Sequence, residues 1–347
     1  MSDKEKIISS QSSSDEYISK VTFKKKIINH SANEIKKLNN QTASDSSSKE
    51  NTSIELNIFN EEKKKFFNCK KICVRTAHLL LVLFVTGNLF FQNTKLRDAL
   101  IQRDYVYLFC FVSLTYSSLL FFFLTCFKNP GYVEKQQVEC RRNFQNDGLP
   151  NIKLRFCTYC HLEQPIRSRH CEECRRCVNK FDHHCPWLET CIGEKNHKYF
   201  WLFVGTTNIL ICWCIEITWS SFVSYSKWST WLLKNLLFLF DAQVLVISFF
   251  LTLSLFLIHT YFMITNTTTW EKFSRKNITY LKILKNESNN PFHQSYLKNV
   301  YLFLFGPRDN TWENVYAAFF KSNLKESNMS NNNSENEVQV KIEKTKH

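Results

Sequence analysis

The chain has 347 residues and a formal net charge of +14. With only six Gly and six Pro, it is neither a fibrous nor a loop-dominated protein. An excess of Lys and Arg is common in nucleic-acid-binding proteins. In this chain the basic residues flank apolar segments rich in Phe and Leu and do not form one basic domain. The composition therefore favours a membrane protein and no nucleic-acid partner.

The two ends of the chain differ in composition from its middle. Residues 1–60 are rich in Ser, Asn and Lys and have few apolar side chains, and residues 322–347 are similar. Such segments cannot bury enough apolar surface to offset the entropy lost on ordering, so we expect two disordered tails. We expect no secretory signal peptide, because no apolar segment closely follows Met1.

Four apolar stretches lie between the tails, and a bilayer crossing requires roughly 20 predominantly apolar residues. The stretches run from about Ala77 to Phe91, from Tyr105 to Phe127, from Tyr199 to Trp219, and from a point after Leu232 to about Ile264. We expect Asp241 to mark the start of the fourth span, because a carboxylate in the middle of a bilayer is costly. Buried helices of a soluble protein are the alternative, and the Trp and Tyr residues at the borders argue against it.

The predicted fold is a mainly α membrane protein with four transmembrane helices, two within residues 76–127 and two within residues 199–264. Lys and Arg number six in the 20 residues before the first span, three in the first loop and thirteen in residues 128–198. They number two in the loop between spans three and four, and five in the 21 residues after span four. Because positive residues concentrate on the cytosolic side, we expect both termini, residues 128–198 and residues 265–321 to be cytosolic.

Seven of the 14 Cys residues lie between Cys157 and Cys191. Reducing cytosol disfavours disulfides, so a cluster there predicts metal binding. The spacing is Cys-x2-Cys-x9-His-Cys-x2-Cys-x2-Cys-x4-Asp-His-His-Cys-x5-Cys, and each Cys-x2-Cys step can place two thiolates on one zinc ion. Six thiols and two imidazoles would complete two tetrahedral sites and leave one thiol, for which Cys185 is the natural candidate. His161 and His197 are also available, and one larger site is an alternative.

The segment Asp182-His183-His184-Cys185 also has the composition of a catalytic site. An ordinary thiol is only slightly ionised at neutral pH, so a nucleophilic Cys needs a base nearby. An imidazole can accept the proton, and a carboxylate can hold that imidazole in the required tautomer. Asp182, His183 and Cys185 provide these groups within one short segment. The alternative is that Cys185 is a further metal ligand or an inert buried thiol.

The whole cluster resembles the DHHC cysteine-rich domain of the DHHC protein S-acyltransferases, which are palmitoyltransferases. The agreement in spacing continues past Cys191 to Asn196 and Phe200, and the resemblance covers about residues 70–310. Three shorter motifs outside the cluster are similar to motifs of the family. They are Asn129-Pro130-Gly131, where Asp-Pro-Gly is usual; Thr268-Thr269-Trp270-Glu271, which is similar to the TTxE motif; and Asn290-Pro291-Phe292 with Asn299 and Gly306, where Ser295 replaces a usual Gly.

The resemblance implies two structural zinc ions, each held by three Cys and one His. The first would be held by Cys157, Cys160, His170 and Cys177. The second would be held by Cys171, Cys174, His184 and Cys191.

The resemblance also implies the roles of the remaining polar residues. Cys185 would accept the acyl group, His183 would act as the base, and Asp182 would orient that base. Thr269 would contact Asp182 from the end of the fourth span. Arg167 would lie near the phosphates of coenzyme A. Gln164 occupies a place where many family members carry Lys.

The implied reaction moves palmitate from palmitoyl-CoA to protein substrates with juxtamembrane or lipid-proximal cysteines. Residues 266–271 and 278–282 look closest to a Golgi- or ER-resident subgroup. Two alternatives belong to other classes. A non-enzymatic membrane adaptor would use its zinc domain to recruit partners, and it would not need Cys185. A membrane ubiquitin ligase would need long gaps between ligand pairs, whereas the gaps in this cluster are short.

Overall fold

The computed structural model describes residues 46–134, 154–282, 284, 290–307 and 312–319, with side chains described from residue 69 onward. The chain divides into two compact units, Met1–Cys69 and Lys70–His347. Helix α2 (Ser46–Phe91) begins in the first unit, and the other described elements belong to the second.

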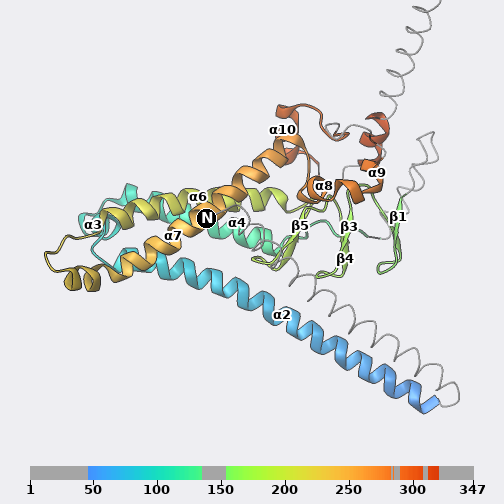
Figure 1. Cartoon of the computed structure of the whole chain (residues 1–347), viewed down its shortest axis with the longest axis horizontal. Coiled ribbons are helices and arrows are strands. Elements are labelled where there is room, and N and C mark those ends of the chain that lie inside the picture. The colour runs from blue at the N-terminus through green and yellow to red at the C-terminus, as the bar shows by residue number, and fades with distance from the viewer. Residues whose placement is uncertain (1–45, 135–153, 283, 285–289, 308–311, 320–347) are drawn as a thin grey trace, which may run out of the picture. The chain divides into compact units, whose positions relative to one another are not determined.

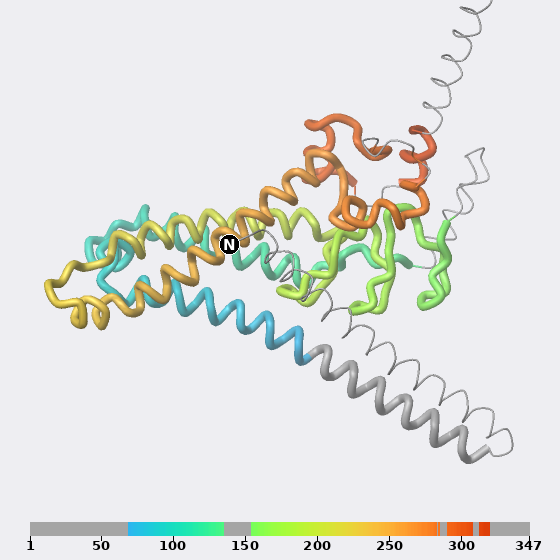
Figure 2. Tube along the Cα trace, viewed as in Figure 1, coloured from blue at the N-terminus to red at the C-terminus, as the bar shows by residue number. Residues whose placement is uncertain are grey.

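Within the described residues, four helices are long and apolar enough to cross a membrane, which confirms the predicted multi-pass membrane protein. They are the Cys69–Phe91 part of α2, α4 (Tyr105–Phe127), α6 (His197–Ser220) and α7 (Trp228–Thr265). Helices α4, α6 and α7 pack alongside one another (Figure 1, Figure 2). A short helix, α3 (Lys95–Gln102), lies in the connection between the first two spans, and Thr94 caps its N-terminus.

The four spans share one apolar core. Val85 and Leu89 of α2 belong to it, together with Phe111 of α4, Leu210 of α6 and Leu245 of α7. Lipid is as apolar as these side chains, so the gain in this core comes from close packing and not from removal of surface from water.

The first helix is longer than the sequence predicted. The apolar stretch starts near Ala77, whereas α2 begins at Ser46. Residues 46–60, which we expected in the disordered tail, are therefore helical. Extending an existing helix requires no new nucleation, so polar residues can continue a membrane helix without a core of their own. Residues 1–45 and the predicted C-terminal tail, 322–347, lie outside the described residues.

Asp241, which we expected to mark the start of the fourth span, lies in a helix that begins before it. Helix α7 begins at Trp228 and continues through Asp241, whose side chain is fully buried. The Nδ2 atom of Asn88 in α2 donates to both carboxylate oxygens of Asp241 at 3.3 Å. The cost of a carboxylate among membrane helices falls when another helix supplies a donor, and the sequence alone could not show this pairing.

Between α4 and α6 the chain forms three antiparallel hairpins. The strands are β1 (Arg155–Cys157) with β2 (Leu162–Gln164), β3 (Arg169–Cys171) with β4 (Arg176–Val178), and β5 (His183–Cys185) with β6 (Thr190–Ile192). An isolated two-stranded hairpin is marginally stable at best. Interactions other than the ladder hydrogen bonds must therefore hold these strands, and Cys and His side chains occur in all three hairpins.

The turn after α4 ties the membrane helices to the hairpins. Oδ1 of Asn129 accepts a hydrogen bond from the N–H of Gly131 at 2.9 Å, and Gly131 has φ 105°, a conformation that favours glycine. The carbonyl of Gly131 accepts from the N–H of Asn179 at 2.7 Å, and that of Pro130 from Lys195 at 3.1 Å. The Asn-Pro-Gly motif thus fixes the exit of α4 onto both ends of the last hairpin.

The segment after α7 packs on the hairpins (Figure 1). It contains α8 (Thr269–Phe273), the 3-10 helix η1 (Arg275–Asn277), α9 (Thr279–Lys282) and α10 (Tyr296–Phe305), and residues 312–319 are also helical. Thr268 and Glu271 form a capping box at the start of α8, each side chain accepting from the other's backbone N–H. Ile166, which follows β2, packs with Ile278 and Phe292 in a shared apolar cluster.

Removing Asp241 should destabilise the bundle through Asn88. We expect Asp241→Leu to lower the melting temperature of the purified protein by a few degrees, because an unpaired buried polar group costs about 1–3 kcal/mol. Thermal unfolding of Asn88→Leu, Asp241→Leu and the double variant measures the coupling. The double variant should lose less than the sum of the two single losses. Strictly additive losses would show that the two side chains do not interact.

Candidate functional site

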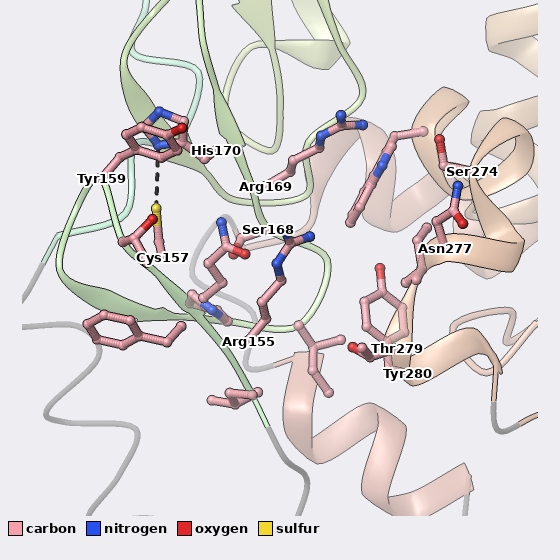
Figure 3. Close-up of a pocket in the computed structure, with 18 of the residues that line it drawn as sticks. Arg155, Cys157, Tyr159, Ser168, Arg169, His170, Ser274, Asn277, Thr279 and Tyr280 are labelled. Atoms are coloured by element: carbon pink, nitrogen blue, oxygen red, sulfur yellow. Dashed lines mark hydrogen bonds between the residues drawn. The ribbon is translucent and has the colours of Figure 1, made fainter. Parts of the chain in front are cut away.

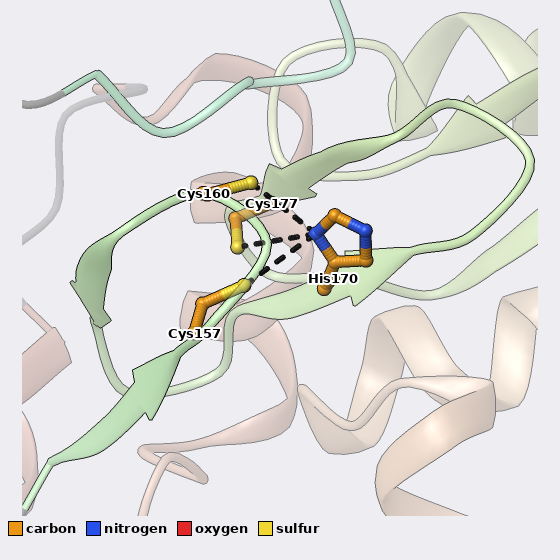
Figure 4. A group of neighbouring side chains, drawn as sticks. All are labelled: Cys157, Cys160, His170 and Cys177. Atoms are coloured by element: carbon orange, nitrogen blue, oxygen red, sulfur yellow. Dashed lines mark hydrogen bonds between the residues drawn. The ribbon is translucent and has the colours of Figure 1, made fainter. Parts of the chain in front are cut away.

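Four side chains from the first two hairpins form the first Cys/His cluster (Figure 4). Nδ1 of His170 lies 3.5 Å from Sγ of Cys157, 3.2 Å from that of Cys160 and 3.9 Å from that of Cys177. His170 and Cys177 face each other across the β3–β4 ladder. The cluster therefore joins the β1–β2 hairpin to the β3–β4 hairpin.

The second cluster joins the β3–β4 hairpin to the β5–β6 hairpin. Nδ1 of His184 lies 3.6 Å from Sγ of Cys171, 3.5 Å from that of Cys174 and 3.7 Å from that of Cys191. In both clusters all four donor atoms lie within 4.8 Å of one another. Zinc ligands at about 2.1 Å for nitrogen and 2.3 Å for sulfur in a tetrahedron are roughly 3.6 Å apart, so both donor sets fit that ion. They are the two groups of four that the family resemblance implied.

Strand β5 separates the metal cluster from the expected catalytic residues. Successive side chains of a strand point to opposite faces. His184 is paired with Cys191 of β6 and belongs to the second cluster. His183 and Cys185, two residues apart, share the other face. Cys185 is buried there, in an apolar cluster with Phe122 and Cys126 near the end of α4 and Phe200 near the start of α6.

Asp182 is fully buried, and three hydrogen bonds fix its carboxylate. Nδ1 of His183 donates to Oδ2 at 2.7 Å. The backbone N–H of Thr269 donates to Oδ1 at 2.8 Å, and its hydroxyl donates to Oδ2 at 2.7 Å. The contact expected between Thr269 and Asp182 is therefore present. It fixes the start of α8, shortly after α7, to the residue that precedes β5.

The electrostatics of this group increase the basicity of His183. Burial acts to raise the pKa of the Asp182 carboxyl, but the nearby His197 and the hydrogen bond from His183 hold that pKa below its usual range. Burial acts to lower the pKa of His183, but its hydrogen bonds to Asp182 and Cys185 outweigh burial and raise the pKa to about 9. Since Nδ1 of His183 is bound to Asp182, the ring presents Nε2 to the Cys185 thiol.

Two basic residues of α2 hold the turn that follows Cys185. The guanidinium of Arg75 donates to the carbonyl of Leu188 and to that of Cys126 in α4, both at 3.2 Å. Nζ of Lys70 lies 2.8 Å from Oε1 of the buried Glu189. The sequence indicated only that these cations precede a membrane span. Their contact with the turn depends on the tertiary packing of α2.

Arg167, which the resemblance placed near the phosphates of coenzyme A, is buried in this structure. Its side chain is 0% exposed, and its guanidinium forms a two-point ion pair with Glu271, with both N–O distances 2.7 Å. It also donates to the side chain and backbone oxygens of Asn266, and it lies over the rings of Phe292 and Trp312. Arg167 therefore joins the hairpins to the segment after α7, and it offers no surface to a ligand.

Two other polar residues from the sequence analysis, Gln164 and His197, have defined places. Gln164 is buried and donates to Sγ of Cys177 at 3.4 Å, so it supports the first cluster. His197, considered as an alternative metal ligand, lies outside both clusters and contacts His259. Sequence reasoning gave His259 no role, although an imidazole within an apolar span is itself a signal of a polar partner.

Comparison with known proteins identifies relatives along most of the chain. A family model described as DHHC palmitoyltransferase matches residues 150–276. Palmitoyltransferase ZDHHC12-A of Danio rerio is 36% identical over 252 residues, which are 70% of this chain and 93% of the relative. Palmitoyltransferase ZDHHC12 of Homo sapiens is 37% identical over 250 residues, 71% of this chain and 92% of the relative. Protein S-acyltransferase 10 of Arabidopsis thaliana is 29% identical and covers 67% of this chain.

Loss of one thiol from the second cluster should remove metal and stability together. We expect Cys171→Ala to bind about one zinc ion fewer per chain than the unmodified protein and to unfold at a lower temperature, because metal binding and folding are coupled. Metal analysis of the purified protein checks this. Cys212→Ala, at an exposed position on α6, is the matched control. An unchanged metal content in Cys171→Ala would remove that residue from the ligand set.

Loss of Arg167 should destabilise the junction of the hairpins with α8. We expect Arg167→Met to lower the free energy of unfolding by about 3–5 kcal/mol, because it leaves the Glu271 carboxylate buried without its partner. The measurement is the thermal unfolding of Arg167→Met beside Arg155→Met, whose side chain is exposed and should be tolerated. If both variants unfold at the wild-type temperature, the ion pair is not holding this junction.

Proposed function

Because the chain belongs to the DHHC palmitoyltransferase family, we propose that it is a protein S-palmitoyltransferase in which Cys185 carries the acyl group. The observation that carries this proposal is the chain of contacts from Thr269 through Asp182 and His183 to Cys185. It provides a nucleophile, a base and an oriented carboxylate in one buried site. Its place at the ends of α4 and α6 brings this site to the boundary of the membrane helices.

The reaction exchanges one thioester for another. The Cys185 thiol gives its proton to Nε2 of His183, and its sulfur attacks the carbonyl carbon of palmitoyl-CoA. The bond from that carbon to the coenzyme A sulfur then breaks, and His183 returns the proton to the leaving thiolate. In the second half, a substrate cysteine gives its proton to His183 and its sulfur attacks the carbonyl carbon of the Cys185 thioester. The bond from that carbon to the Cys185 sulfur breaks, and His183 returns the proton to the Cys185 thiolate. Asp182 stabilises the imidazolium in both halves, and no ATP is consumed.

The acyl chain of the donor is proposed to lie among the four spans. Phe122 of α4 and Phe200 and Val204 of α6 surround Cys185 with apolar surface, which supports this location. Each CH2 group transferred from water to such surroundings is worth about 0.8 kcal/mol. Protein substrates would then present cysteines close to the membrane surface.

The coenzyme A head group is proposed to bind beside the hairpins. A cavity of about 280 Å3 lies there, with Arg155 and Arg169 on one wall and Ser274, Asn277 and Thr279 on the other (Figure 3). Arginine side chains pair well with phosphate groups, and hydroxyl and amide groups can donate to them. This assignment replaces Arg167, whose donors are engaged by Glu271 and Asn266.

Two zinc ions are proposed to be structural in this enzyme. Cys157, Cys160, His170 and Cys177 would hold the first. Cys171, Cys174, His184 and Cys191 would hold the second. Four protein ligands complete a tetrahedron and leave no open position for substrate, so each ion supplies a cross-link between hairpins. Cys185 belongs to neither group.

The proposed orientation has the hairpins and both termini in the cytosol. The high density of Lys and Arg before the first span and within residues 128–198 supports this assignment. Cytosolic hairpins would meet acyl-CoA in the compartment where thiols stay reduced. The membrane is proposed to be that of the Golgi or the ER, on the similarity of residues 266–271 and 278–282 to a subgroup of the family.

Replacement of the nucleophile should abolish acylation and leave the metal clusters intact. We expect Cys185→Ser, incubated with labelled palmitoyl-CoA, to form no hydroxylamine-sensitive adduct and to pass no label to a protein thiol. Its zinc content should equal that of the unmodified protein, because Cys185 lies outside both clusters. Mass spectrometry of the purified protein locates the adduct.

Cys212→Ser is the matched control, since this exposed cysteine of α6 lies far along the helix from the hairpins. It should label normally. Normal substrate acylation by Cys185→Ser would refute the assignment of Cys185 and would favour the non-enzymatic adaptor.

A further inference from the structure

Two buried histidines lie beside the Asp182–His183 pair and have no part in the reaction as derived so far. His197 is the first residue of α6 and is 4% exposed, and His259 lies in α7 and is 3% exposed. Nε2 of His197 and Nδ1 of His259 are 3.0 Å apart, which is a hydrogen-bond distance. Ionisable side chains are expensive within membrane helices, so an imidazole pair at this place is a candidate for a role in the site.

The His259 ring borders both members of the catalytic pair. Its Nδ1 lies 4.0 Å from Oδ2 of Asp182, the oxygen to which His183 donates. The ring centroids of His259 and His183 are 5.6 Å apart. Phe200 contacts both rings, at 4.9 Å from His259 and 5.5 Å from His183. A shift of the His259 ring would therefore reach Asp182, His183 and Phe200 together.

The hydrogen bond between the two histidines restrains that ring. It requires one proton between Nε2 of His197 and Nδ1 of His259, because two bare nitrogens or two N–H groups would repel each other. Whether the proton is on Nε2 of His197 or on Nδ1 of His259, Nδ1 of His259 is hydrogen-bonded to His197 and is not available to form a hydrogen bond with Asp182. Oδ2 of Asp182 is then left to His183 and the Thr269 hydroxyl.

We infer that His259 and His197 are positioning residues that hold the Asp182–His183 pair in its reactive arrangement, an inference that rests on the function proposed above. They act through Asp182 and His183 and do not touch the reacting thioester. The property that matters is a polar atom at Nδ1 of His259 and another at Nε2 of His197. Ring volume alone does not suffice.

Three substitutions at His259, made in the full-length protein, separate the polar atom from the ring. Asn places its amide near the position of Nδ1, Gln places it near Nε2, and Phe keeps a ring without a polar atom. With labelled palmitoyl-CoA as the probe, acyl-enzyme formation should slow about tenfold in His259→Phe and His259→Gln, and His259→Asn should recover to within about threefold of wild type. The KM for palmitoyl-CoA and the zinc content should not change.

The same comparison at His197 should give the reverse order. His197 uses Nε2, so His197→Gln should retain more of the acylation rate than His197→Asn. His161→Asn, at an exposed histidine with φ 51°, is the control and should match the wild-type rate. A role limited to packing would give equal rates for the two amides at each position, and that outcome overturns the inference.

The outcomes also separate this inference from the proposed function. Cys185→Ser gives the background labelling. If the unmodified protein is labelled no more than this background, the proposed function itself fails. If the unmodified protein is acylated and His259→Phe is acylated equally fast, only the positioning role fails. Should His259→Phe lose zinc and fail to fold, the comparison of His259→Asn with His259→Gln still decides, because both carry amides.

Discussion

The buried ion pair between Arg167 and Glu271 is the interaction on which the geometry of the site depends. Glu271 caps the short helix α8, whose first residue, Thr269, fixes the Asp182 carboxylate. Arg167 comes from the hairpins, so the pair joins the region that carries Cys185 to the segment that follows α7. Desolvating two charges is costly, and the two-point geometry, the Asn266 oxygens and the flanking rings of Phe292 and Trp312 offset that cost.

Much of the fold could be predicted because its signals are local. Apolar length identified the four spans, and the spacing of Cys and His, read with the family resemblance, identified the two groups that the structure brings together. What could not be predicted depends on contacts between distant segments. Asp241 is buried in α7, where Asn88 from another helix reaches it. Arg167 is buried because Glu271, about a hundred residues away, is its partner. A single sequence shows neither pairing.

The hairpin formed by β3 and β4 belongs to both metal clusters. His170 and Cys177 face the first cluster, whereas Cys171 and Cys174 face the second. The three hairpins are therefore linked in series, and the last of them carries Cys185. Each ladder is too short to be stable alone. The position of Cys185 relative to the membrane helices is therefore set by the two clusters, the turn after α4 and the basic residues of α2.

The alternation of side chains along β5 has a consequence for how this site can change over evolutionary time. His183 and Cys185 share one face of the strand, and His184 between them serves the opposite face. Inserting or deleting one residue here would exchange the faces, so that His183 would point toward the second Cys/His cluster and His184 toward Cys185. Related sequences can therefore differ in this segment by substitutions but not by insertions or deletions. The turn of residues 186–189 lies beyond the strand, so a change in its length would not alter which face each β5 side chain occupies.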